Sequence, residues 1–224
     1  MGINKKRIAE RQKQAAAAAK KESNGRTAAM VSIIVAIVAS LVVLGIGVAL
    51  VVDHIASAPK DYIAEIKIED YGTITLELDG DAAPITVENF VKLAQSGFYD
   101  GLTFHRIIEG FMMQGGCPAG NGSGSSDQEI TGEFSANGWD NPIKHERGVI
   151  SMARGNEYNS GSCQFFIVHE TSPHLDGSYA AFGRVTSGIE IVDKICTEAE
   201  PTDNNGTIAK ADQPRIASIT VREK

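Results

Sequence analysis

Residues 104–116 read FHRIIEGFMMQGG, and residues 151–168 read SMARGNEYNSGSCQFFIV. In the first stretch, large apolar residues surround one arginine and one glutamine, Arg106 and Gln114. A pair of core strands would explain the apolar residues. It would not explain the two polar ones, because Arg and Gln are seldom buried without partners. An apolar pocket with a few aimed polar groups is the usual pattern of a ligand site, so we predict that Arg106 and Gln114 belong to such a site.

Alternating residues open and close the region that contains these two stretches. At residues 64–69 and again at residues 74–79, apolar residues alternate with polar ones, and an Asp-Tyr-Gly turn separates the two runs. The same alternation returns at residues 219–222. A period of two is typical of strands that bury one face. We therefore expect antiparallel strands at both ends of this region.

Two other segments show the helical period. The first begins at Pro84, places its apolar residues on one face and ends at Gly97. The second covers residues 188–199, in which Ile189, Val192 and Cys196 share a face. Many short strands with two helices predict an antiparallel barrel or sandwich with helices at its ends.

The N-terminal part of the chain has a different composition. Residues 1–27 are basic and rich in Ala, and residues 28–52 carry no charged side chain. A run of about 20 apolar residues is what a helix needs to cross a bilayer. Because positive charge stays on the cytoplasmic side, we expect a basic cytoplasmic tail (1–27), a single transmembrane helix (28–52), a linker (53–60) and an extracytoplasmic domain (61–224). This architecture places the chain in the cell membrane, as in a bacterium with an exposed membrane face.

A cleaved signal peptide is the alternative interpretation of the apolar run. Ala56-Ser57-Ala58 has the small residues of a cleavage site, but Pro59 follows it, and the run exceeds the usual length of about 7–15 residues. We favour the uncleaved anchor. The tail has good helix formers but no apolar face, so we expect it to remain solvated beside anionic lipid.

Charge and motif spacing exclude several classes of function. The first 29 residues carry eight basic and two acidic side chains, whereas the whole chain has a net charge of −7, so the main domain is acidic and unsuited to nucleic acid. The three cysteines and the histidines show no ligand spacing, so we expect no metal site and no disulfide framework, although one cysteine pair remains open. Ser162 and His169 lack the elbow motif and orienting acid of a hydrolase.

The order and spacing of the motifs resemble the cyclophilin family. The motifs are FHRIIEGFMMQGG, GVISMAR, SGSCQFFI, HLDG and FGRV, and the similarity runs from about Ile63 to Glu223. The resemblance implies a mainly β fold, namely a closed eight-stranded antiparallel β-barrel capped by two α-helices, here preceded by the transmembrane helix. It also implies peptidyl-prolyl cis-trans isomerase activity on proline-containing polypeptides, with no cofactor. We expect a monomer.

The resemblance also assigns roles to single residues. Arg106 corresponds to the catalytic arginine, Gln114 to the polar residue that orients it, and Phe111 to a wall of the proline pocket that completes the catalytic set. The implied substrate-binding residues are Met112, Gly122, Ala153, Arg154, Gly155, Gln164, Phe166, His174, Leu175 and Tyr179. A guanidinium aimed at the prolyl nitrogen would stabilise the twisted amide, whose uncatalysed rotation has a barrier of about 18–20 kcal/mol.

Three positions depart from the family pattern. His174 replaces a Trp that the resemblance implies also contacts cyclosporin, so sensitivity to that inhibitor is an open question. Tyr179 replaces a His at the pocket rim, and Cys163 replaces a Ser beside the groove. These changes leave room for an alternative function, a module that binds Pro-containing segments with little catalysis. The retained Arg106 favours the enzyme.

Overall fold

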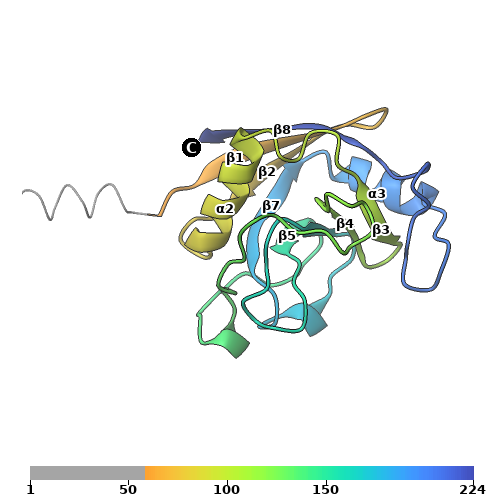
Figure 1. Ribbon diagram of the computed structural model, residues 1–224. Helices are drawn as coiled ribbons and strands as arrows, with labels where there is room; N and C mark the ends of the chain where they lie inside the picture. Colours follow the sequence, from red (N-terminus) through yellow and green to blue (C-terminus); the bar gives the residue numbers. More distant parts are fainter. Residues whose placement is uncertain (1–58) are drawn as a thin grey trace, which may run out of the picture. The chain divides into compact units, whose positions relative to one another are not determined.

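The computed structural model describes residues 59–224, which form a curved eight-stranded antiparallel sheet with two α-helices (Figure 1). The strands are β1 (Tyr62–Ile68), β2 (Gly72–Leu78), β3 (Phe104–Ile108), β4 (Met112–Gly115), β5 (Val149–Met152), β6 (Phe165–Val168), β7 (Ala181–Ser187) and β8 (Ile216–Glu223). The helices are α2 (Pro84–Gln95) and α3 (Ile189–Glu198), with 3-10 turns η1 (Ser135–Asn137) and η2 (Pro173–Leu175). The strands predicted at both ends of the domain and the two predicted helices are therefore confirmed.

Other predictions lie outside the described residues. These are the basic tail at 1–27, the transmembrane helix at 28–52 and most of the linker at 53–60. Within residues 59–224, no helix combines the length and the apolar character that crossing a bilayer requires.

The sheet is open, so the predicted closed barrel is wrong. The strand order is β3-β4-β6-β5-β7-β2-β1-β8, which leaves β3 and β8 as edge strands. At the start of these two strands, an isolated bridge joins Thr103 to Arg215, and the Gly101 amide donates to the Ile216 carbonyl at 2.8 Å. Beyond it, the outer edge of β3 bridges from Arg106 to Thr207, which belongs to the loop between α3 and β8. That loop takes the place where β8 would have closed the barrel, and the result is a half-barrel.

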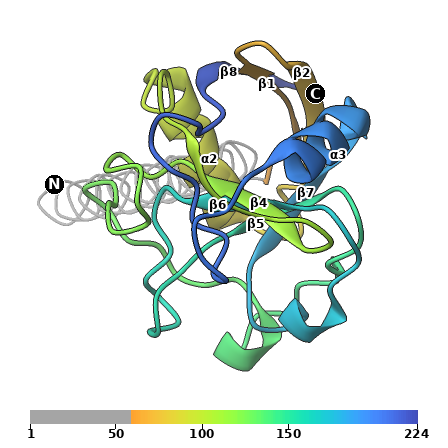
Figure 2. The ribbon, with the colours of Figure 1, turned by 90° about the vertical axis from the view of Figure 1, so that its right-hand side faces the viewer.

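An aromatic cluster fills the inside of the half-barrel. The ring of Phe90, on the apolar face of α2, lies 5.3 Å from those of Tyr99 and Phe182 and 5.5 Å from that of Phe165. All four side chains are completely buried, and burial of each contributes on the order of 2–3 kcal/mol. Helices α2 and α3 lie apart from each other along the curved sheet (Figure 2), and buried residues of both belong to this main core. Helix α2 contacts β8, and α3 contacts β2 and β4.

The opposite face of β4 and β6 carries a second apolar cluster. Side chains on a strand alternate between the two faces, so in β6 Phe165 and Ile167 belong to the main core, whereas Phe166 and Val168 belong to the second cluster. The buried members of that cluster are Met112, Val149, Phe166, Val168, Leu175 and Ala181. Several of these residues, among them Met112 and Phe166, also line the candidate site.

Helix α2 begins without a cap from its own sequence. Ala83 at the N-cap offers no side-chain hydrogen bond. Glu133, which directly precedes Phe134 and η1, accepts hydrogen bonds from the amides of Ile85 (2.9 Å) and Thr86 (2.8 Å) and from the Thr86 hydroxyl (2.7 Å). A carboxylate at a helix N-terminus satisfies amides that have no partner within the helix and interacts favourably with the helix dipole.

Candidate active site

Strand register places the two predicted polar residues beside an aromatic ring. In the β3–β4 ladder Arg106 pairs with Gln114, and in the β4–β6 ladder Gln114 pairs with Phe166. Directly paired residues on adjacent strands point to the same face of a sheet. Arg106, Gln114 and Phe166 therefore form one row across three strands, on the face that carries the second apolar cluster.

The Arg106 side chain is held at three points. Its Nε donates to the carbonyl of Asn205 at 2.7 Å, and its Nη1 lies 3.4 Å from Gln114 Oε1 and 3.8 Å from Met112 Sδ. Burial lowers the pKa of Arg106 from its usual value, but a guanidinium remains charged at any physiological pH. The Asn205 contact was not anticipated, because Asn205 lies in the loop before β8 and no motif marks it.

A pocket of about 230 Å³ lies beside this row of residues. Its lining consists of Arg106, Phe111, Met112, Gln114, Ala153, Arg154, Phe166, Leu175 and Tyr179. Every one of these had been predicted as a catalytic or substrate-binding residue. The lining combines the apolar side chains of Phe111, Met112, Phe166 and Leu175 with the polar groups of Arg106, Gln114 and Arg154, a combination typical of a small-ligand site.

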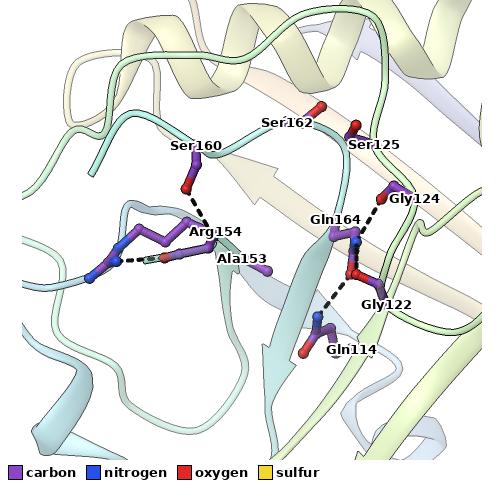
Figure 3. Close-up of a pocket in the computed structure, with 10 residues that line it drawn as sticks. Gln114, Gly122, Gly124, Ser125, Ala153, Arg154, Ser160, Ser162 and Gln164 are labelled. Atoms are coloured by element: carbon purple, nitrogen blue, oxygen red, sulfur yellow. Dashed lines mark hydrogen bonds between the residues drawn. The ribbon is translucent and has the colours of Figure 1, made fainter. Parts of the chain in front are cut away.

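A second pocket of about 160 Å³ adjoins the first and shares three of its lining residues, Gln114, Ala153 and Arg154 (Figure 3). The structure also places the predicted Gly122, Gly155 and Gln164 here. The lining residues that had not been predicted are Gly124, Ser125, Ser160 and Ser162. A glycine and three serines carry no spacing signal, so they become recognisable only once the loops are folded.

Hydrogen bonds connect Arg106 to the loop around the second pocket. Gln114 Nε2 donates to Gln164 Oε1 at 3.0 Å, and Gln164 Nε2 donates to the carbonyls of Gly122 at 2.9 Å and Gly124 at 2.7 Å. Figure 3 shows the Gln114 and Gln164 side chains directed at each other between the strands. This chain fixes which end of the Gln114 amide faces the guanidinium.

The rim of the first pocket carries a cation–aromatic contact. The Arg154 guanidinium carbon lies 4.8 Å from the centre of the Tyr179 ring, and Arg154 Nε donates to the carbonyl of Ser178 at 3.0 Å. Tyr179 in turn packs edge-on against Phe166, with ring centres 5.8 Å apart. Tyr179, which departs from the family pattern, thus forms an aromatic wall of the pocket and a cation–π contact that holds the Arg154 guanidinium.

His174 is the one predicted binding residue that lines neither pocket. It lies in η2, immediately before Leu175, and its ring centre is 5.3 Å from that of Phe111. The imidazole therefore packs against a pocket wall from outside. A smaller ring than the Trp found in many family members presents less apolar surface at this rim.

A buried histidine supports the floor of the first pocket. His145 stacks on Phe166 with ring centres 6.1 Å apart and an interplanar angle of 17°. Its ring nitrogens lie 3.0 Å from Asp176 Oδ1 and 3.0 Å from Ser151 Oγ. Burial lowers the pKa of His145, and the contact with Asp176 opposes this effect. The Ser151 hydroxyl is completely buried, so this Ser-His-Asp set cannot attack a substrate.

His105, next to the predicted catalytic arginine, makes stability depend on pH. Its side chain is only 4% exposed, and burial together with the charge of Arg106 lowers its pKa from 6.5 to about 4, opposed only in part by a backbone contact with Thr103. Between those pH values the unfolded chain binds a proton that the folded chain does not. The free energy of unfolding should therefore fall by about 3 kcal/mol as the pH drops from 6.5 to 4.

Denaturant unfolding at several pH values checks this expectation. His105→Gln is the matched variant, because it keeps a polar side chain that does not titrate, and its unfolding free energy should decline less over the same interval. Equal slopes in the two proteins would contradict the assignment to His105.

Comparisons with known proteins agree with this geometry. The model of the family described as cyclophilin type peptidyl-prolyl cis-trans isomerase/CLD matches residues 63–221. Peptidyl-prolyl cis-trans isomerase B of Bacillus subtilis is 54% identical over 123 residues, which cover 55% of this chain and 82% of that protein. A peptidyl-prolyl cis-trans isomerase of Helicobacter pylori is 49% identical over 126 residues, which cover 55% of this chain and 75% of that protein.

A solved structure shares the fold. It is the crystal structure of a cyclophilin type peptidyl-prolyl cis-trans isomerase from Cryptosporidium parvum, determined in the presence of the dipeptide Ala-Pro. It matches with a TM-score of 0.63 and 28% sequence identity, covering 72% of this chain and 99% of that chain.

Proposed function

Because this chain belongs to the family of cyclophilin-type peptidyl-prolyl cis-trans isomerases, we propose that Arg106 catalyses the rotation of prolyl bonds held in the 230 Å³ pocket. The observation that carries this proposal is the position of the guanidinium. Arg106 lines the pocket together with the apolar side chains of Phe111, Met112 and Leu175, on the same row as Gln114 and Phe166. The substrates are proline-containing polypeptides.

The proposed mechanism follows from the chemistry of the amide. A planar prolyl amide shares the nitrogen lone pair with the carbonyl, and this conjugation is lost when the bond twists. In the twisted state the nitrogen becomes pyramidal and basic, so a donor aimed at it binds that state more strongly than either planar isomer. Interactions that strengthen only in the transition state raise the rate. No nucleophile or general acid–base pair is required.

The two pockets bind different parts of the peptide. The apolar walls formed by Phe111, Met112, Phe166 and Leu175 hold the prolyl ring, while the acyl side of the bond rotates. The smaller pocket beyond Ala153 receives a flanking residue of the peptide. Gln114 lines both pockets and contacts Arg106, so it couples the position of the peptide to that of the guanidinium.

A protease-coupled assay with a proline-containing peptide tests the proposed function. In this assay the protease cleaves only the trans isomer, so isomerisation limits the signal. We expect the full-length protein to accelerate the slow phase in proportion to its concentration. A protein that binds the peptide without any such acceleration would support the alternative of a binding module and contradict the enzyme mechanism.

We also propose that this is a monomeric, membrane-anchored isomerase of bacterial type that assists protein folding outside the cytoplasm. The support is in the sequence: an uncharged run at 28–52 follows a basic segment at 1–27, and the positive charge is expected on the cytoplasmic side. Membrane fractionation followed by N-terminal sequencing tests this location. A mature chain that begins near Pro59 would contradict the anchor and support a secreted isomerase.

A further inference from the structure

The turn between β3 and β4 places Phe111 at the wall of the proline pocket. The Ile108 carbonyl accepts a hydrogen bond from the Phe111 amide at 3.0 Å, which closes a four-residue turn. Gly110 is the third residue of this turn and has a φ of 75°, as type II turns require. The Gly110 amide points away from the hydrogen bond that closes the turn, so it requires an acceptor from elsewhere in the chain.

His169 supplies that acceptor. Its Nδ1 accepts the Gly110 amide at 2.9 Å, and its own backbone amide donates to the Phe111 carbonyl at 2.9 Å. The His169 side chain is only 11% exposed. One residue at the end of β6 therefore binds the turn through two atoms, one on each side of Phe111.

The first of these bonds determines which ring nitrogen carries the proton. A backbone amide can only donate, so Nδ1 must be unprotonated and Nε2 must carry the hydrogen. Nε2 lies 3.3 Å from Asp193 Oδ1, in helix α3. Asp193 is thus placed to accept the Nε2 hydrogen and to hold the imidazole in the tautomer that receives the turn.

Asp193 is itself held by Arg147. The two guanidinium nitrogens of Arg147 donate to the two carboxylate oxygens at 2.6 and 2.7 Å, and Arg147 Nη1 also lies 3.3 Å from the His169 carbonyl. A two-point pair of this kind limits the orientation of the carboxylate. The contacts run from α3 through the imidazole to the turn at Gly110.

We propose that His169 is a positioning residue for prolyl isomerisation: it holds the β3–β4 turn so that Phe111 closes the proline pocket, and Asp193 orients its ring. This inference rests on the proposed function. His169 lines neither pocket, and its backbone amide donates to the carbonyl of Phe111, which does line the first one, so its effect passes through Phe111. Because Phe111 contacts the prolyl ring in both planar and twisted states, loosening the turn weakens binding uniformly, which raises KM more than it lowers kcat.

Two substitutions separate the contacts of His169. The Oδ1 atom of His169→Asn can replace Nδ1 as the acceptor for Gly110, whereas the amide of His169→Gln reaches toward Asp193 and leaves Gly110 without its acceptor. In the full-length protein we expect His169→Gln to raise KM by about fivefold to tenfold, the effect of losing about one hydrogen bond. We expect kcat to change by less than about twofold, and His169→Asn to restore most of the affinity.

Hydrogen exchange of the Gly110 amide, followed by NMR, provides a readout that does not depend on activity. The amide should be protected in the wild type and in His169→Asn, and exchange at least about tenfold faster in His169→Gln. Equal exchange in all three proteins, or an unchanged KM in His169→Gln, would overturn the role of His169. If the three proteins showed the expected exchange rates but the wild type had no isomerase activity, the proposed function would be contradicted instead.

Discussion

Replacing Arg106 with alanine should lower kcat/KM for prolyl isomerisation by about 10²-fold to 10³-fold, the usual effect of removing one preorganised donor from a transition state. The loss should fall mainly on kcat, because the guanidinium binds the twisted amide more strongly than the planar one. The apolar walls of the pocket remain, so the peptide still binds. The protease-coupled assay over a range of peptide concentrations separates the two parameters.

Two further variants make the test specific. Arg106→Lys keeps a positive charge but loses the planar fork that contacts Asn205 and Gln114, so we expect it to retain less than about a tenth of the activity. Arg222→Ala removes an exposed arginine from β8 and should behave as the wild type. If Arg106→Ala kept more than about a third of the wild-type kcat/KM, Arg106 would not be the main catalytic group.

Replacing Glu133 with alanine should lower the free energy of unfolding by about 3–4 kcal/mol. The carboxylate is completely buried and accepts three hydrogen bonds from Ile85 and Thr86 at the start of α2. Its removal leaves buried donors unsatisfied, at about 1–3 kcal/mol each when no relaxation occurs, and removes a negative charge from the helix N-terminus. Chemical denaturation monitored by circular dichroism measures the change.

Glu129→Ala is the matched control for this experiment. Glu129 lies four residues earlier and is exposed, so its removal should change the unfolding free energy by less than about 0.5 kcal/mol. Comparable losses in both variants would mean that charge, and not the cap on α2, determines the effect. A loss below about 1 kcal/mol in Glu133→Ala would mean that water replaces the carboxylate at the helix end.

Local patterns in the sequence predict the elements of this domain well. The alternation in β1, β2 and β8 and the apolar face of α2 depend on side-chain periods of 2 and 3.6 residues, which neighbours in the chain determine. Closure of the sheet does not depend on neighbours. The prediction of a closed barrel was wrong because the loop before β8 pairs with β3 at Thr207. Nothing in the composition of that loop indicates this pairing.

The residues of the candidate site likewise fall into those that the sequence predicted and those that it did not. Arg106 and Gln114 stood out because polar residues are unusual among so many apolar ones, and the structure places them on one row with Phe166. Asn205 and the serines of the second pocket did not stand out, because small polar residues are common in loops. No motif marks His169, since its partners Gly110 and Asp193 lie 59 and 24 positions away.

The sequence by itself determined the strands at both ends of the domain, the two helices, the polar pair Arg106 and Gln114, and the family to which the chain belongs. These depend on residue type and short-range spacing, which any chain segment carries with it. Only the tertiary structure decided that the barrel stays open, that Glu133 caps α2, and that His169 and Asp193 hold the turn of Phe111. Such contacts join residues far apart in the chain, and their free energy exists only when the packed domain brings the partners within hydrogen-bonding distance.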